Sequence, residues 1–138
     1  MEPEQNDLVM RTLSSIIPNI ASSRPDLFEI RPSDAEGGST DALHARPNNP
    51  KLNPVAHKPF YTIDKEIAHV HTQDRSLHVW LSDADAKVVI EKGWGERFVV
   101  KFAPSGYVMV YAPRNEDELN VVRNIVKAGD IWFAGSEL

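Results

Sequence analysis

Two short stretches, Glu66–His71 (EIAHVH) and Ser76–Leu81 (SLHVWL), decide the fold that this sequence predicts. Each has the length and apolar content of a β-strand. The residues between them, TQDR, form a polar connection of the length that joins the two strands of a hairpin. The two stretches therefore predict an antiparallel hairpin near the middle of the chain.

The register of this hairpin determines which side chains share a face. If the strands pair symmetrically about residues 73 and 74, the predicted pairs are Ile67 with Trp80, His69 with His78 and His71 with Ser76. Directly opposite residues share a face, with Cβ atoms roughly 4.5–5.5 Å apart. One face therefore gathers three imidazoles and an indole: His69, His71, His78 and Trp80. The other face is apolar and is predicted to meet the core: Ala68, Val70, Leu77 and Val79.

This site depends on the register. A shift of one residue would move His78 to the other face and leave only the His69/His71 pair. The simplest alternative is a hairpin whose polar face is merely solvated.

Length, composition and charge limit the class of protein. The chain has 138 residues, 41% of them hydrophobic and 25% charged, which suits a single globular domain. A net charge of −5 without a run of Lys or Arg argues against a nucleic-acid partner. The absence of cysteine excludes disulfides and thiolate zinc sites. No apolar run approaches the ~20 residues of a membrane span, so a cytoplasmic protein is expected.

Before the hairpin, residues 5–17 have apolar side chains at helical spacing, and Pro18 is expected to end or kink that helix. Residues 27–31 suit a short strand. Residues 32–59 are rich in Pro, Gly, Ser, Asn and Asp, and they predict an irregular segment, partly disordered at 33–48.

After the hairpin, Ser82 and Asn115 are predicted helix N-caps, and Gly93 is predicted to end the first of these two helices. Between the helices, residues 98–102 and 107–111 predict a second hairpin. The order indicates a single-domain α+β fold, an antiparallel sheet built from hairpins with helices packed on it. Its parts are 1–31, an N-terminal helix and possible strand; 32–59, irregular; and 60–134, the main α+β domain.

Four motifs in this order resemble the luciferase domain of fungal luciferases and of luciferase-like proteins in fungi and bacteria. They are Lys65–His71 (KEIAHVH), Ser76–His78 (SLH), Lys92–Arg97 (KGWGER) and Tyr111–Glu116 (YAPRNE). The resemblance covers roughly residues 60–133. Light-producing members commonly carry a histidine after the Gly-Trp-Gly-x-Arg motif, where this chain has Phe98.

The resemblance implies an oxygenase chemistry. Fungal luciferases oxidise 3-hydroxyhispidin, a styryl-pyrone, with molecular oxygen and no metal or organic cofactor, through a peroxide that loses carbon dioxide. An enol must lose a proton to react with oxygen, and histidine is the natural base near neutral pH. The resulting oxyanion needs positive charge or hydrogen-bond donors, and a flat substrate needs apolar walls. The implied ligand is a small aromatic or pyrone-type molecule.

This chain offers candidates for each role. The candidate catalytic residues are His69, His71 and His78 as base and protonated partner, Arg97 for the oxyanion, and Glu96 to orient a neighbour. The candidate substrate-binding residues are Trp80, Trp94 and Tyr111. The structural alternatives are an exposed ion pair for Glu96 and Arg97, a packed corner for Trp94 and a structural role for Tyr111.

Two other functions remain open from the sequence. Three histidines on a hairpin can bind iron, copper or zinc with a coordination position left for substrate. The chain can also be a non-catalytic binding or regulatory module of the same fold, which the phenylalanine at position 98 favours. The sequence does not identify the substrate or the oligomeric state.

Overall fold

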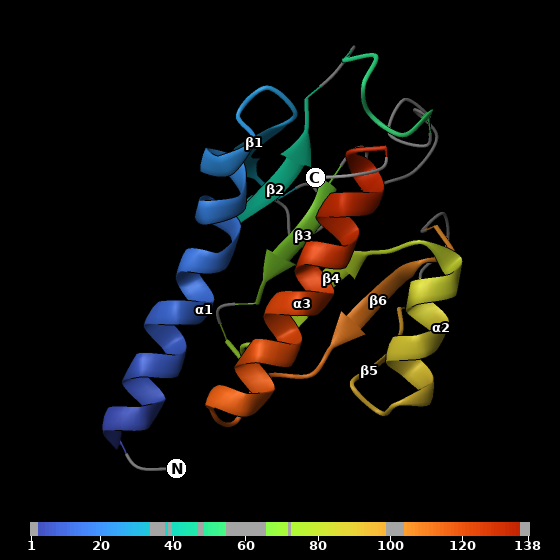
Figure 1. Ribbon diagram of the computed structural model, residues 1–138. Helices are drawn as coiled ribbons and strands as arrows, with labels where there is room; N and C mark the ends of the chain where they lie inside the picture. The colour runs from blue at the N-terminus through green and yellow to red at the C-terminus, as the bar shows by residue number, and fades with distance from the viewer. Residues whose placement is uncertain are drawn as a thin grey trace.

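The computed structural model describes residues 3–33, 38, 40–46, 49–54, 66–71, 73–98 and 104–135. In order, its elements are α1 (Pro3–Ser23), β1 (Phe28–Pro32), β2 (Asp41–Ala45), β3 (Glu66–Val70), β4 (Leu77–Trp80), α2 (Asp83–Glu91), β5 (Gly95–Arg97), β6 (Tyr107–Val110) and α3 (Glu116–Phe133) (Figure 1). Among the described residues, no helix combines the length and apolar character needed to cross a bilayer.

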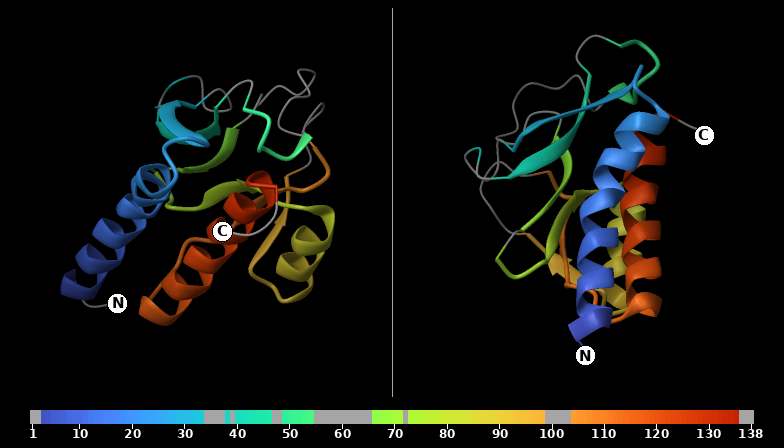
Figure 2. Two further views of the ribbon diagram at one scale, coloured as in Figure 1. Left: turned by 45° about the horizontal axis from the view of Figure 1, so that its top comes forward. Right: turned by 90° about the vertical axis from the view of Figure 1, so that its left-hand side faces the viewer.

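The six strands form one antiparallel sheet in the order β1-β2-β3-β4-β6-β5. The helices lie on one face of this sheet, and α1 and α3 run side by side there (Figure 2). This arrangement confirms the predicted α+β class, an antiparallel sheet with helices packed on it. The described parts of the N-terminal half belong to the same sheet, because β1 and β2 continue it outward from β3.

The central hairpin has the predicted register. His69 is paired with His78 and Ala68 with Val79. The backbone N–H of His71 donates to the carbonyl of Ser76 at 2.8 Å, which extends the pairing by one position.

The two predicted N-caps are confirmed. The Ser82 side chain accepts from the backbone N–H of Asp85 at 3.1 Å, and the Asn115 side chain accepts from that of Glu118 at 2.9 Å. Gly93 has a φ of 79°, the left-handed conformation that favours glycine after a helix.

The structure differs from the sequence-based expectation in α1. Of the two effects expected of Pro18, an end of the helix is wrong, because α1 continues to Ser23. A proline inside a helix removes one backbone hydrogen bond. Beyond it, however, Ile20 and Ala21 pack against the core, and this burial offsets the loss.

The segment 32–59 was expected to be irregular, but it contains β2 between β1 and β3. Leu43 and His44 of this strand are fully buried. Residues 34–37, 39, 47, 48 and 55–59 lie outside the described residues. The expected strand at 98–102 lies outside the described residues except for Phe98, and the structure has β5 just before it, at Gly95–Arg97.

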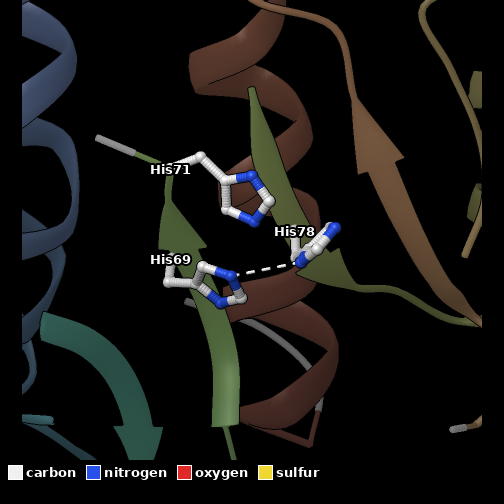
Figure 3. A group of neighbouring side chains, drawn as sticks. All are labelled: His69, His71 and His78. Carbon is white, nitrogen blue, oxygen red and sulfur yellow. Dashed lines mark hydrogen bonds between the residues drawn. The ribbon is translucent and has the colours of Figure 1, made fainter. Parts of the chain in front are cut away.

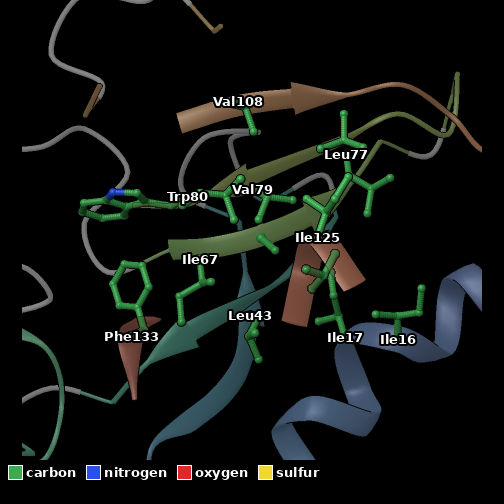
Figure 4. Close-up of a cluster of buried hydrophobic side chains, with 14 of the residues drawn as sticks. Ile16, Ile17, Leu43, Ile67, Leu77, Val79, Trp80, Val108, Ile125 and Phe133 are labelled. Carbon is green, nitrogen blue, oxygen red and sulfur yellow. The ribbon is translucent and has the colours of Figure 1, made fainter. Parts of the chain in front are cut away.

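The core lies between the sheet and the helices (Figure 4). Leu43, Leu77 and Val79 from the sheet pack with Ile17 and Ile125 from the helices, and all are buried. Burial of each such side chain contributes about 1.5–3 kcal/mol before entropy is counted. Helix α3 approaches β4 closely at Gly129, where an added Cβ would lie 2.9 Å from the Trp80 carbonyl oxygen and 3.3 Å from Val79 Cγ1.

Gly129→Ala tests this close approach. Alanine normally stabilises a helix interior by about 1 kcal/mol relative to glycine. Here we expect a net loss of about 1–3 kcal/mol in the free energy of unfolding, because the methyl group must displace backbone and core atoms. Urea denaturation measures the change, with Asn124→Ala at an exposed position of α3 as the control. A Gly129→Ala protein at least as stable as wild type would contradict this packing.

Candidate active site

A β-bulge in β3 decides which side chains reach the sheet face opposite the helices. Leu43 is paired with Ala68, but the next residue, His44, is paired with Glu66. Ile67 is therefore an extra residue in β3. In a regular strand, residues three apart point to opposite faces. The bulge instead brings Glu66 and His69 to the same face, and it turns Ile67 into the core.

Glu66, His69 and His78 form a buried hydrogen-bonded chain. Glu66 Oε2 lies 2.6 Å from His69 Nδ1, and His69 Nε2 lies 3.1 Å from His78 Nδ1. The relative exposures are 0%, 0% and 2% in the same order. Figure 3 shows the imidazoles in front of the hairpin and α3 behind it. These hydrogen-bonded side chains therefore lie on the sheet face that the helices do not cover.

The carboxylate end of this chain fixes the direction of its hydrogen bonds. An ionised carboxylate only accepts, so His69 Nδ1 donates to Glu66. His69 Nε2 then carries a lone pair and accepts from His78 Nδ1. In this tautomer the basic nitrogen of His78 is Nε2.

Further polar groups surround the Glu66 carboxylate. The Ser33 hydroxyl lies 2.9 Å from Oε1 and 3.0 Å from Oε2, and His44 Nε2 lies 4.0 Å from Oε1. A buried carboxylate needs such partners, because burying an uncompensated charge costs several kcal/mol. Ser33, His44 and Glu66 were not predicted from the sequence as site residues. Glu66 lies inside the first motif, but regular alternation places it on the core face, and a bulge has no reliable sequence signal.

His71 completes the histidine cluster at its more exposed end. Its ring lies 5.3 Å from that of His69 and 4.5 Å from that of His78. His71 Nδ1 is 3.4 Å from the Ser76 hydroxyl and 3.7 Å from Asp74 Oδ1. Hydrogen bonds from Ser76, together with the charge of His71, keep the pKa of Asp74 below its usual value.

Two aromatic rings border the cluster. The Phe98 ring lies 4.2 Å from that of His78, and the Tyr107 ring lies 5.4 Å from it. The cluster therefore has an apolar wall next to His78, and Phe98 at the end of the Gly-Trp-Gly-x-Arg motif is part of that wall.

The predicted pairing of Trp80 with Ile67 implied that Trp80 lies beside the histidines. In the structure it does not. Its ring is 4.9 Å from that of Phe133 and 6.3 Å from that of Trp132, both in α3, so it packs on the helix side. β4 pairs with β6 in a regular register through Trp80, so the ring contacts with α3, and not the bulge in β3, account for its place.

The remaining predicted residues gather at the β5 edge of the sheet. In the register, Glu96 is opposite Met109 and Met109 is opposite His78, so Glu96 shares the histidine face, roughly 10 Å from His78 by strand spacing. The Tyr111 hydroxyl donates to Glu96 Oε2 at 3.1 Å, and this carboxylate raises the pKa of Tyr111.

Arg97 and Trp94 are separate from the histidines. Arg97 is opposite Val108, a core residue, so by register its side chain is directed to the other face. Its guanidinium donates to the Ser105 carbonyl at 2.6 Å. Trp94 and Tyr111 line a separate cavity of about 370 Å³.

The histidine cluster also has the composition of a metal site. One ligand nitrogen from each of His69, His71 and His78 lies within 4.8 Å of the others. Three imidazoles suit zinc, copper or iron, and a carboxylate on the outer nitrogen of a ligand histidine is typical of such sites. The same side chains can thus serve as a proton relay or as a ligand set.

Comparison with known proteins gives one consistent result. The sequence-family model described as the luciferase domain matches residues 64–129 of this chain. A luciferase of Armillaria mellea is 34% identical over 124 residues, covering 83% of this chain and 46% of the relative. A luciferase of Neonothopanus nambi is 32% identical over 133 residues, covering 91% of this chain and 50% of the relative. The chain thus spans about half the length of these relatives, and no solved structure matches it.

Glu66→Gln tests the buried chain of hydrogen bonds. We expect a loss of about 1–3 kcal/mol in the free energy of unfolding, because the amide is a weaker acceptor for His69 and Ser33 than the carboxylate. Urea denaturation at neutral pH measures it. The control is Glu91→Gln on the surface of α2, where a change within about 0.5 kcal/mol is expected. Equal stability of the two variants would contradict the proposed contacts.

Proposed function

The chain belongs to the luciferase-domain family, and on that premise we propose that it is a luciferase-like oxygenase of a pyrone or phenolic enol. The reaction uses molecular oxygen without a metal or organic cofactor, and a compound like 3-hydroxyhispidin is the proposed substrate. The observation that carries the proposal is the buried chain from Glu66 through His69 to His78. It orients one imidazole as a base beside two aromatic rings, those of Phe98 and Tyr107.

His78 is the proposed general base. Its Nδ1 proton is donated to His69, so the Nε2 lone pair takes the proton of the substrate enol. The imidazolium that forms is stabilised by His69, which is in turn polarised by the Glu66 carboxylate. Glu66 and His69 are positioning residues in this scheme, since they act through His78.

The enolate carbon then forms a bond with molecular oxygen, and negative charge develops on the peroxide. His71 is the proposed donor to that charge, because its ring is 4.5 Å from His78 and it lies at the more exposed end of the cluster. Phe98 and Tyr107 supply the aromatic wall that was expected of Trp80. Glu96 and Tyr111 share the histidine face and are proposed for its rim.

His78→Gln tests the proposed base. Metal-stripped protein is mixed with 3-hydroxyhispidin in air, and photons and oxygen uptake are recorded together. We expect the variant to lose at least about 100-fold in rate, the usual contribution of a general base. Glu66→Gln should lose less, with a changed pH profile, and Glu91→Gln should retain the wild-type rate. An unchanged rate in a folded His78→Gln protein would contradict the assignment.

A second function, a histidine metalloenzyme, is favoured by the three ligand nitrogens within 4.8 Å. Elemental analysis of protein purified without chelator distinguishes the cofactor-free oxygenase from the metalloenzyme. A cofactor-free oxygenase keeps its oxygen uptake after chelation and dialysis. A metalloenzyme contains about one metal ion per chain, and it loses uptake on dialysis and recovers it when iron or copper is added. Binding of a pyrone with no uptake in either state would instead indicate the non-catalytic module.

A further inference from the structure

A groove of about 740 Å³ lies between α1 and α3, on the helix side of the sheet. Its volume is in the range of small-molecule pockets. The histidine cluster is on the opposite face of the sheet, as Figure 3 shows, so the groove is a separate place on the molecule. Nothing in the proposed oxygenase chemistry uses it.

Each helix contributes one face to this groove. On α3, Arg123, Lys127 and Asp130 are spaced by four and three residues, so they form one stripe along the helix. Ile131 lies beside this stripe, and α1 contributes Ile16 and Ile20. The groove thus combines an apolar surface with charged groups.

The charged groups of the groove are mostly cations. Arg24 follows α1 and pairs with Asp26 at 3.4 Å, and Arg123 and Lys127 come from α3. Asp130 is the one acidic residue of the lining. Within the described part of the chain, neither Lys127 nor Arg123 makes an ion pair, and the Arg123 guanidinium donates to the side-chain oxygen of Asn120 at 3.0 Å. A net positive groove in a chain of net charge −5 favours an anionic ligand.

Asp130 is the most unusual of these groups. It is 3% exposed, and among the described residues its Oδ1 has no hydrogen-bond partner. Burial raises its pKa to about 6, although the charges of Arg24 and Lys127 act in the opposite direction. Near pH 6 and below, the protonated carboxyl can therefore donate a hydrogen bond inside the groove.

We propose that this groove binds a small organic anion, a carboxylate or sulfonate carried on an apolar body. The anionic group lies between Arg123 and Lys127, the apolar body contacts Ile16, Ile20 and Ile131, and Asp130 donates to the ligand in its acid form. This site goes beyond the proposed oxygenase function and does not depend on it.

The probe is 8-anilinonaphthalene-1-sulfonate, an aromatic sulfonate whose fluorescence rises on transfer to an apolar site. Lys127→Gln and Arg123→Gln should each weaken its binding by about tenfold, the value of one charge-assisted hydrogen bond. The control is Lys87→Gln, which removes an exposed cation from α2 and should leave the affinity unchanged. No binding, or equal affinity in all three variants, would overturn the proposal.

Competition tests the required ligand chemistry. 2-Naphthoate should displace the probe, whereas 2-naphthol, which has the same ring system without the charge, should not. Inorganic phosphate should also fail, since it has no apolar body. Equal displacement by naphthoate and naphthol would overturn the anion requirement, and displacement by millimolar phosphate would overturn the need for an apolar body.

The pH dependence tests the role of Asp130. The sulfonate stays charged between pH 5 and 7.5, as do the cations that line the groove, Arg24, Arg123 and Lys127. Protonation of Asp130 removes a negative charge next to the anion, so wild-type affinity should be roughly fivefold higher at pH 5 than at pH 7.5. Asp130→Asn should bind at both pH values as wild type does at pH 5. A variant that keeps the wild-type pH dependence would overturn this role.

Discussion

The buried carboxylate of Glu66 is the constraint on which the polar half of this structure depends. A carboxylate with no exposure is tolerated only where donors surround it. Ser33 follows β1, His44 is in β2 and His69 is in β3, so three successive segments converge on one side chain. The N-terminal half is thereby tied to the hairpin by polar contacts as well as by the ladder of the sheet.

Because of the bulge, β3 contributes an apolar side chain to the core and polar side chains to the opposite face of the sheet. Ile67 joins the apolar face under the helices, and Glu66 and His69 turn together to the other face. The helix face is held by close packing, as at Gly129 against Trp80. The opposite face can then carry a row of polar groups whose relative positions are fixed by strands anchored from behind. This division allows a buried, preorganised chain of hydrogen-bonded side chains on so small a domain.

The sequence predicted the parts of this arrangement that follow from local rules. Symmetric pairing about the short connection predicted the pair of His69 with His78, and side-chain chemistry predicted the caps at Ser82 and Asn115. The bulge was not predictable, because an inserted residue in a strand leaves no pattern of its own. For that reason Glu66 was overlooked. Trp80 was placed on the wrong face because strand alternation does not include its contacts with Trp132 and Phe133 of α3. β2 was also missed, since tertiary pairing, and not local propensity, makes residues 41–45 a strand.

The central claim is that Glu66 sets the tautomers of His69 and His78, and nitrogen NMR of the imidazole side chains tests it most directly. Both histidines are expected to carry their proton on Nδ1, with the His69 proton protected from exchange. Glu66→Gln should disturb both signals while the sheet remains intact. A His69 proton on Nε2, or nitrogen signals that are the same in wild type and Glu66→Gln, would contradict it.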